Sequence, residues 1–288
     1  MRRRIEYVVP PEYDGKPAKV FLRRGLGMSA RTLTVLKNDP DGLTLNGAHV
    51  RTVDPLKTGD VLGVTLPEEQ NAIAPSDPTS LDVVYEDDDV LVVNKPAGLA
   101  VHPTHNHQGD TLANMVTGHL LRKNDSGLFR AIGRLDKQTS GLVLLARNRH
   151  AASCLQGAYE KTYYAIAEGV LTGQGTIDTP IYRPDPGKTL RAAGETGETA
   201  ITHWTALKTD GEHTLLRVTL ETGRTHQIRV HLSSVGHPLA GDEMYGGHTG
   251  RVSRAALHCG ELVFTHPVTG ERVRLTAPFP ADFFLLPG

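Results

Sequence analysis

The sequence of 288 residues has only two cysteines and no long run of apolar residues. Cys154 and Cys259 are too few to build a disulfide framework or a cysteine-ligated metal site, so we expect a reducing compartment. No window approaches the roughly 18 consecutive apolar residues that a membrane-spanning helix requires. The basic start at residues 1–4 is not followed by an apolar stretch of signal-peptide length. We therefore predict a cytoplasmic protein without a membrane partner.

A strong net charge is also missing, because the formal charge of the chain is −1 at pH 7. A nucleic-acid site would have to come from local clusters of basic residues. Residues 1–60 provide such a cluster, since they contain seven Arg and four Lys against two Glu and five Asp. The sign reverses in the acidic run at residues 86–89, which we interpret as a solvated turn without a ligand.

The length is sufficient for one large domain and a small additional one. Residues 67–79 contain three prolines among Glu, Asn, Ala and Ser and lack apolar periodicity, which is typical of a linker. We place the boundary near residue 75, and we predict domains at residues 1–75 and 76–288.

The first domain shows a helix-then-strand order. Ser29 is a suitable N-cap for a helix over residues 30–37. Residues 43–47 and 61–64 have strand patterns, and the first ends in an Asn-Gly pair that favours a hairpin turn. This pattern predicts a small α/β module.

The second domain has many short strand patterns and few helices. The strand patterns lie at residues 83–85, 90–94, 142–146, 163–167, 202–208, 215–220 and 257–264, and the helix patterns at 111–121, 149–159 and 225–235. We predict an α+β domain with a mixed, mostly antiparallel sheet and flanking helices.

The strongest chemical signal is a charged loop directly before the buried strand at residues 142–146. Asp136 in this loop would be held near a sheet edge, with the polar Thr139 between it and the strand. An isolated Asp in such a place more often pairs with a nearby Arg and closes a turn. Other segments have to support a chemical role.

Those segments exist. Arg134-Leu135-Asp136, followed by Thr139 to Leu142, resembles the catalytic motif of the RluA-type pseudouridine synthases. Residues 92–103, 161–165 and 223–231 resemble three further motifs of that family, in the same order along the chain. One departure is Gly133, where many members carry His and a sister group carries Gly. It bears on how the neighbouring loop contacts RNA.

The resemblance implies conversion of uridine to pseudouridine without redox change, cofactor or metal. The enzyme breaks the bond from the sugar to a ring nitrogen, rotates the base and joins the sugar to ring carbon 5. This chemistry needs a carboxylate that attacks the anomeric carbon or removes the neighbouring sugar proton, and a group that accepts the proton from carbon 5. The target uridine has to be flipped out of a folded RNA into the pocket.

The resemblance also implies the site residues. Asp136 is the carboxylate, and Arg229 is the buried cation that keeps it ionised. Tyr163 stacks on uracil or relays a proton, although a single Tyr is more often a core aromatic. Arg224 is the alternative partner of Asp136 or a phosphate ligand. Arg134 and Thr139 are the other candidates for binding substrate in the catalytic domain.

The first domain resembles the ribosomal-protein-type alpha-L RNA-binding domain that often accompanies these synthases. Its RNA-contact candidates are Arg23, Arg24, Arg31 and Lys37, for which a solvated helix face is the alternative. By analogy we prefer large-subunit ribosomal RNA as the partner over transfer RNA. We expect a monomer without an obligatory protein partner.

Two other functions stay open on the sequence alone. His102, His105 and His107, together with His226 and His231, invite a metallohydrolase hypothesis, but no HExxH or paired-Cys motif accompanies them. A non-catalytic RNA-binding protein would use the same basic residues and would not need Tyr163.

Overall fold

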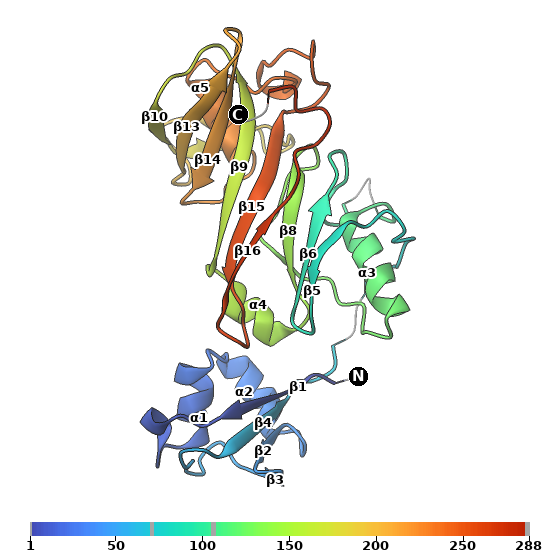
Figure 1. The fold of residues 1–288 in the computed structure, drawn as a ribbon, viewed down its shortest axis with the longest axis vertical. Helices are drawn as coiled ribbons and strands as arrows, with labels where there is room; N and C mark the ends of the chain where they lie inside the picture. The colour runs from blue at the N-terminus through green and yellow to red at the C-terminus, as the bar shows by residue number, and fades with distance from the viewer. Residues whose placement is uncertain (1, 70–71, 105–107, 286–288) are drawn as a thin grey trace.

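The computed structural model describes residues 2–69, 72–104 and 108–285. The described chain forms a small N-terminal unit and a larger unit around a long sheet, and the two lie one above the other in Figure 1. The larger unit has the predicted α+β architecture with a mostly antiparallel sheet.

The N-terminal unit has its own sheet and core. Its strands follow the order β1 (Arg4–Val8), β4 (Val61–Thr65), β2 (Leu43–Leu45) and β3 (Ala48–His49), and its helical segments are η1 (Pro11–Tyr13), α1 (Ala18–Val20), η2 (Phe21–Gly25) and α2 (Ala30–Lys37). Ser29 caps α2 as predicted, because its side chain accepts a hydrogen bond from the Thr32 amide at 3.1 Å. Buried Leu22, Leu36 and Leu62 belong to the core of this unit.

The larger unit is organised around a ten-stranded sheet over the described residues. Its main path is β10 (Gln174–Asp178), β13 (Ile201–Thr209), β14 (His213–Leu220), β9 (Tyr159–Glu168), β15 (Leu257–Thr265), β8 (Ser140–Ala146), β6 (Val90–Lys95) and β5 (Val83–Glu86), with β16 (Arg272–Thr276) beside β15 and β7 (Ala131–Ile132) beside β8. The β8–β15 pair is parallel, with His258 opposite Ser140. This pairing brings the loop before β8, which carries Asp136, next to the C-terminal part of the chain.

Helices cover parts of this sheet. They are α3 (Leu112–Arg122), α4 (Arg149–Leu155) and α5 (Gln227–Ser234). Two further elements lie outside the main sheet: a short hairpin of β11 (Ile181–Tyr182) and β12 (Ala192–Ala193), and the turn η3 (Glu243–Tyr245). In Figure 1, α4 lies at the end of the sheet that faces the N-terminal unit, whereas α5 lies near the opposite end. No helix among the described residues is long and apolar enough to span a membrane.

The structure changes several predicted bounds. The helix predicted at residues 149–159 ends at Leu155, because Gln156 is extended and Gly157 has a φ of +75°. Strand β1 was not predicted, since its sequence is interrupted by Arg4 and Glu6, whose side chains face solvent. β16 was missed for the same reason, because its exposed positions carry Arg and Thr.

The acidic run is not a simple solvated turn, and that interpretation was wrong. Asp89 is only 2% exposed and accepts two hydrogen bonds from Arg3, at 3.2 and 2.7 Å, and one from Asn148 at 2.8 Å. Glu86 contacts His119 and Lys123 at 2.9 and 2.6 Å. A carboxylate as buried as Asp89 needs such partners, because its desolvation is otherwise costly. The Arg3–Asp89 pair also joins the N-terminal unit to the larger one.

Replacing Asp89 tests this contact. We expect Asp89→Ala to lower the free energy of unfolding by about 2 kcal/mol, because Arg3 and Asn148 lose their shared acceptor. Asp88→Ala is the matched control, since Asp88 also contacts Arg3 but its side chain is 72% exposed. Its effect should stay below about 0.5 kcal/mol in urea unfolding. Equal losses in the two variants would contradict a special role of Asp89.

Candidate active site

Asp136 lies in the loop between β7 and β8, where backbone contacts fix its position. The Thr139 amide donates to the Asp136 carbonyl at 3.1 Å, and the Gly98 amide donates to the Lys137 carbonyl at 2.8 Å. The buried Lys95 ammonium donates to the Lys137 carbonyl at 3.2 Å and to two carbonyls of its own segment. Because the turn is closed by backbone groups, the Asp136 carboxylate is left to point out of the loop.

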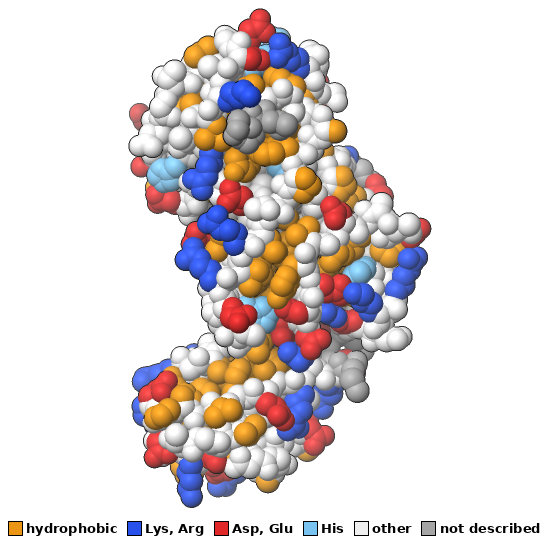
Figure 2. Space-filling model, in the orientation of Figure 1, with side chains coloured by type: hydrophobic (Ala, Val, Ile, Leu, Met, Phe, Trp, Pro, Cys, Tyr) orange, Lys and Arg blue, Asp and Glu red, His pale blue; other side chains and the backbone are white. Residues whose placement is uncertain are grey.

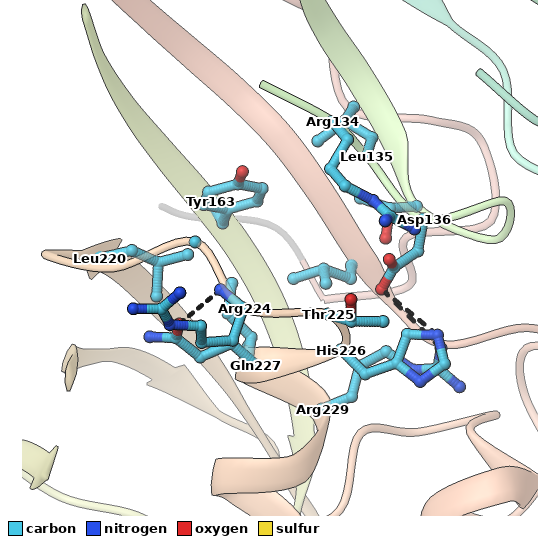
Figure 3. Close-up of a pocket in the computed structure, with 14 residues that line it drawn as sticks. Arg134, Leu135, Asp136, Tyr163, Leu220, Arg224, Thr225, His226, Gln227 and Arg229 are labelled. Carbon is cyan, nitrogen blue, oxygen red and sulfur yellow. Dashed lines mark hydrogen bonds and ion pairs between the residues drawn. The ribbon is translucent and has the colours of Figure 1, made fainter. Parts of the chain in front are cut away.

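The carboxylate faces Arg229 of helix α5. The distance from Asp136 Oδ2 to Arg229 Nη1 is 3.9 Å, and Figure 3 shows the carboxylate pointing toward Arg229 and His226. Arg229 is buried, although the sequence pattern placed it off the apolar face of its helix. Its guanidinium donates from Nε and Nη2 to Asp242 at 2.6 and 2.7 Å. Asp242 therefore holds the guanidinium in place and leaves Nη1 for Asp136.

Two opposing effects set the charge of Arg229. Burial lowers the pKa of Arg229. The hydrogen bonds to Asp242 and the negative charges of Asp242 and Asp136 raise this pKa, and together they outweigh burial, so the net change is upward. Arg229 thus remains a cation in the buried site. A cation at this distance stabilises the ionised form of a carboxylate.

His226 is a site residue that the sequence analysis treated only as a metal candidate. It precedes α5 with a φ of +59°, and its Nε2 lies 4.0 Å from Asp136 Oδ2. Its Nδ1 lies 2.8 Å from the Tyr245 hydroxyl, which accepts a hydrogen bond from the Arg191 amide. If the hydroxyl donates its proton to Nδ1, the neutral imidazole carries its proton on Nε2, toward Asp136.

The signal available in the sequence was the position of His226 inside the 223–231 motif. The structure adds its left-handed backbone, a conformation that in residues other than glycine concentrates at functional sites.

Tyr163 lies on β9 with its side chain 8% exposed. Burial raises its pKa well above the ordinary value, and the neighbouring Cys259, Tyr159 and Asp136 act in the same direction. Its phenol therefore stays protonated at neutral pH and is suited to stacking or donating, not to acting as a phenolate. Tyr164 follows Tyr163 on the strand, points to the other face and donates to Glu261 at 2.6 Å.

These groups meet at a cavity. A deep part of about 60 Å³ is lined by residues of the 133–139 loop, Tyr163, Leu220, the 223–229 segment and Leu257. A wider cavity of about 700 Å³ opens on the other side of Asp136, and it also includes Arg134, His226 and Arg229. Asp136 thus lies where a small pocket meets an open groove, and a group entering from the groove can reach its carboxylate.

The other predicted residues lie at different distances from this centre. Arg224 does not contact Asp136, because its Nε donates to the Thr199 carbonyl at 3.0 Å and its Nη1 pairs with Glu198. Arg134 is exposed on the cavity rim, and Thr139 is buried beside Asp136. Arg23, Arg24, Arg31 and Lys37 are all exposed on the N-terminal unit, and Arg31 lines a cavity with Arg130 and Arg149. Figure 2 shows Lys and Arg side chains on the surface of this unit.

The predicted histidine cluster is not brought together among the described residues. Both ring nitrogens of His231 are engaged, by Thr202 at 2.8 Å and by the Thr179 carbonyl at 2.9 Å. His102 packs edge-on against Phe129. His105 and His107 lie outside the described residues.

A partly exposed carboxylate, an adjacent buried arginine and a tyrosine at one cavity form a site suited to nucleophilic or acid–base chemistry. The comparisons with known proteins identify that chemistry. Residues 89–234 match the family model described as RNA pseudouridylate synthase. This region contains Asp136, Tyr163 and Arg229.

Similar proteins agree with this match. An uncharacterized RNA pseudouridine synthase of Bacillus subtilis, YjbO, is 39% identical over 89% of this chain and 93% of its own length. The ribosomal large subunit pseudouridine synthase D of Neisseria meningitidis serogroup A is 37% identical over 98% of this chain and 81% of its own length. Among solved structures, human RNA Pseudouridylate Synthase Domain Containing 1 has a TM-score of 0.58 at 27% identity, over 72% of this chain and 86% of that protein.

The chain therefore belongs to the RNA pseudouridylate synthase family, and it is an RNA pseudouridine synthase. This confirms the family and the reaction that the sequence motifs predicted, and it replaces the metallohydrolase and non-catalytic hypotheses.

The position of His226 generates a pH prediction. Burial lowers its pKa below the ordinary 6.5; Asp136 and Asp242 raise it, and Arg229 and Arg191 lower it. The imidazole is therefore neutral at neutral pH, and acidification adds a second cation beside Asp136, which lowers the reactivity we expect of that carboxylate.

We expect the activity of the wild type to fall below about pH 6.5. In His226→Asn the fall should be smaller, because no imidazolium can form beside Asp136. Initial rates measured from pH 5 to 8 check this, and an identical acid limb in both proteins would show that His226 does not set it.

Proposed function

We propose that this enzyme converts specific uridines of large-subunit ribosomal RNA to pseudouridine, with Asp136 as the catalytic carboxylate. The observation that carries the catalytic role is the 3.9 Å contact between Asp136 and the buried Arg229 at the cavity. The choice of RNA rests on the relative named ribosomal large subunit pseudouridine synthase D, which aligns over 98% of the chain.

In the proposed mechanism, the flipped uridine enters from the groove beside Asp136. The carboxylate attacks the anomeric carbon or removes the neighbouring sugar proton, and the bond to ring nitrogen 1 breaks. The base rotates and carbon 5 joins the sugar, after which carbon 5 loses its proton and nitrogen 1 gains one. Atoms and electrons balance without a redox partner, because the product is an isomer of the substrate.

The neighbouring side chains have separate tasks in this proposal. Arg229, held by Asp242, keeps Asp136 ionised when the base excludes water. The protonated Tyr163 packs against the uracil ring. Arg134 at the rim takes the space that the flipped uridine leaves in the RNA, and Thr139 supports the loop under Asp136. Arg224 binds the RNA backbone outside the reaction centre.

We further propose that residues 1–75 form the RNA-binding module of the enzyme. The support is that Arg23, Arg24, Arg31 and Lys37 are exposed and that Arg31 faces the catalytic unit across a shared cavity with Arg130 and Arg149. The monomeric state and the cytoplasmic location stay predictions, and an RNA target of this kind is compatible with both.

Replacing Asp136 tests the catalytic role. We expect Asp136→Asn to abolish pseudouridine formation and leave RNA affinity within about twofold, because the amide keeps the shape and loses the nucleophilic charge. The measurement is mapping of pseudouridine by a chemical-adduct primer-stop assay on unmodified ribosomal and transfer RNA. Primer stops that appear after treatment with wild type and not with Asp136→Asn would also identify the target uridine. Turnover by the variant would exclude this role.

Replacing the N-terminal basic residues tests the module. The full-length quadruple variant Arg23→Gln, Arg24→Gln, Arg31→Gln and Lys37→Gln should bind the target RNA more weakly. The slope of log affinity against log salt should become shallower by up to about 3, because each neutralised phosphate contact releases a counterion. Arg51→Gln is the control, since Arg51 is already paired with Asp54. If filter binding gives the same slope for both variants, these residues do not contact RNA.

A further inference from the structure

Gly133 stands directly before the catalytic motif, and the structure shows why this chain has no side chain there. Its φ is +75°, and a Cβ at this position would lie 2.6 Å from the Tyr159 hydroxyl and 3.3 Å from the Lys161 ammonium. A distance of 2.6 Å is too short for a Cβ contact. The space that a larger residue would need is therefore occupied by two polar groups of β9.

Lys161 shares one face of β9 with the proposed catalytic tyrosine. Tyr159, Lys161 and Tyr163 alternate along the strand, so their side chains follow one another on the same face at intervals of about 7 Å. The Lys161 ammonium lies 5.3 Å from the centre of the Tyr159 ring, in a cation–π contact. The ring thus helps to hold the ammonium beside Gly133.

This part of β9 lies at an opening in the sheet. Strand β14 pairs with β9 only from Thr162 onward, whereas β15 pairs with it back to Tyr159. A cavity of about 600 Å³ fills the space beyond the end of β14, and its lining includes Gly133, Tyr159 and Lys161. Its lining residues Arg134, Tyr163, Leu220 and Gly223 also line the pocket at Asp136, so the two spaces adjoin.

The charges around this cavity favour an anion. Its three acidic residues have other partners, Glu160 with Arg272 at 3.1 Å, Glu261 with Arg274 at 3.4 Å and Glu221 with His203 at 2.7 Å. Within the described part of the chain, no carboxylate forms a salt bridge with Lys161. The rim adds the exposed Arg134 and Arg217. The Lys161 ammonium thus borders this cavity without a carboxylate partner among the described residues.

We propose that this cavity binds the backbone phosphate of a nucleotide next to the target uridine, with Lys161 as its ligand. The inference rests on the proposed RNA substrate. A stacked base is the less suitable occupant, because Lys161 already covers a face of the Tyr159 ring. A phosphate matches the ammonium, which has no carboxylate partner among the described residues, and Lys161 lies only two residues from Tyr163 on the same face of β9.

A phosphate ligand gives Lys161 a pH signature. Burial lowers the pKa of Lys161, and the adjacent Cys259 acts in the opposite direction. A bound phosphate stabilises the charged form, so RNA binding should weaken as rising pH removes the proton from the free enzyme. The other ionisable groups that line this cavity are Tyr159, Glu160 and Tyr163 on β9, Arg134 in the loop, Arg217 on β14, Glu221 just after β14, Glu261 on β15 and Arg274 on β16.

The test compares full-length wild type, Lys161→Gln, Lys161→Arg and the control Lys208→Gln on the same RNA. Lys208 is exposed on β13 and lines neither the pocket at Asp136 nor this cavity. KM and kcat are measured from pseudouridine formation, and Kd is measured separately by filter binding at several salt concentrations and from pH 6.5 to 9.

We expect Lys161→Gln to raise Kd and KM about tenfold with kcat within about twofold, and to make the salt slope shallower by about 0.7 to 0.9. Lys161→Arg should restore most of the affinity and remove its loss at high pH, because a guanidinium stays charged. Gly133→Ala, which pushes on the same ammonium, should raise Kd in the same direction. Circular dichroism identifies any variant that fails to fold.

Two results would overturn the inference: a Lys161→Gln variant with the Kd and salt slope of Lys208→Gln, or one that loses kcat alone. Wild type that forms no pseudouridine on any RNA would instead reject the proposed function. The Kd series would still decide whether Lys161 binds the RNA backbone.

Discussion

The buried pair of Arg229 and Asp242 is the interaction on which the active site depends. A guanidinium inside the protein is tolerated only when its charge and its donors are matched, and Asp242 satisfies two of them. The pairing also fixes the plane of the guanidinium, so that one further nitrogen faces Asp136 at 3.9 Å. Helix α5 supplies Arg229, the β7–β8 loop supplies Asp136, and the segment before η3 supplies Asp242. The loop that carries Asp136 thus has to pack against the segment from Arg229 to Asp242, about a hundred residues later, before the carboxylate has its cation.

The pairing of charges also distinguishes the proposed reaction centre from the surfaces that we propose to contact RNA. Near Asp136 the ionised groups are paired and buried, which suits a step that has to proceed without water. Farther out, Arg134 is exposed on the rim and Lys161 lines the adjoining cavity, which suits a flexible polyanion. The change from paired, buried charges to more accessible ones occurs along β9, within a few residues of Tyr163. One strand therefore connects the proposed reaction centre to the proposed phosphate site.

Local sequence patterns were sufficient for what depends on neighbouring residues. The cap at Ser29, the buried strand after Asp136 and the opposite faces of Tyr163 and Tyr164 follow from periodicity and turn chemistry alone. Asp242 could not be found in this way, since it reaches Arg229 only through the folding of the chain around η3. The burial of Asp89 was missed for the same reason, because its partner Arg3 is 86 residues away and makes an acidic run compatible with the interior.

The parallel pairing of β8 with β15 makes the timing of synthesis matter. Ser140, at the start of β8, lies opposite His258, which the ribosome adds more than a hundred residues later. The sheet that carries the Asp136 loop on one side and Tyr163 on the other is therefore completed only when the last part of the chain has emerged. Until then the nascent polypeptide exposes an unpaired central edge, and its N-terminal unit, with a core of its own, is free to fold first. In this order of assembly, the surroundings of Asp136 form only after residues 257–265 have been made, and after the N-terminal unit.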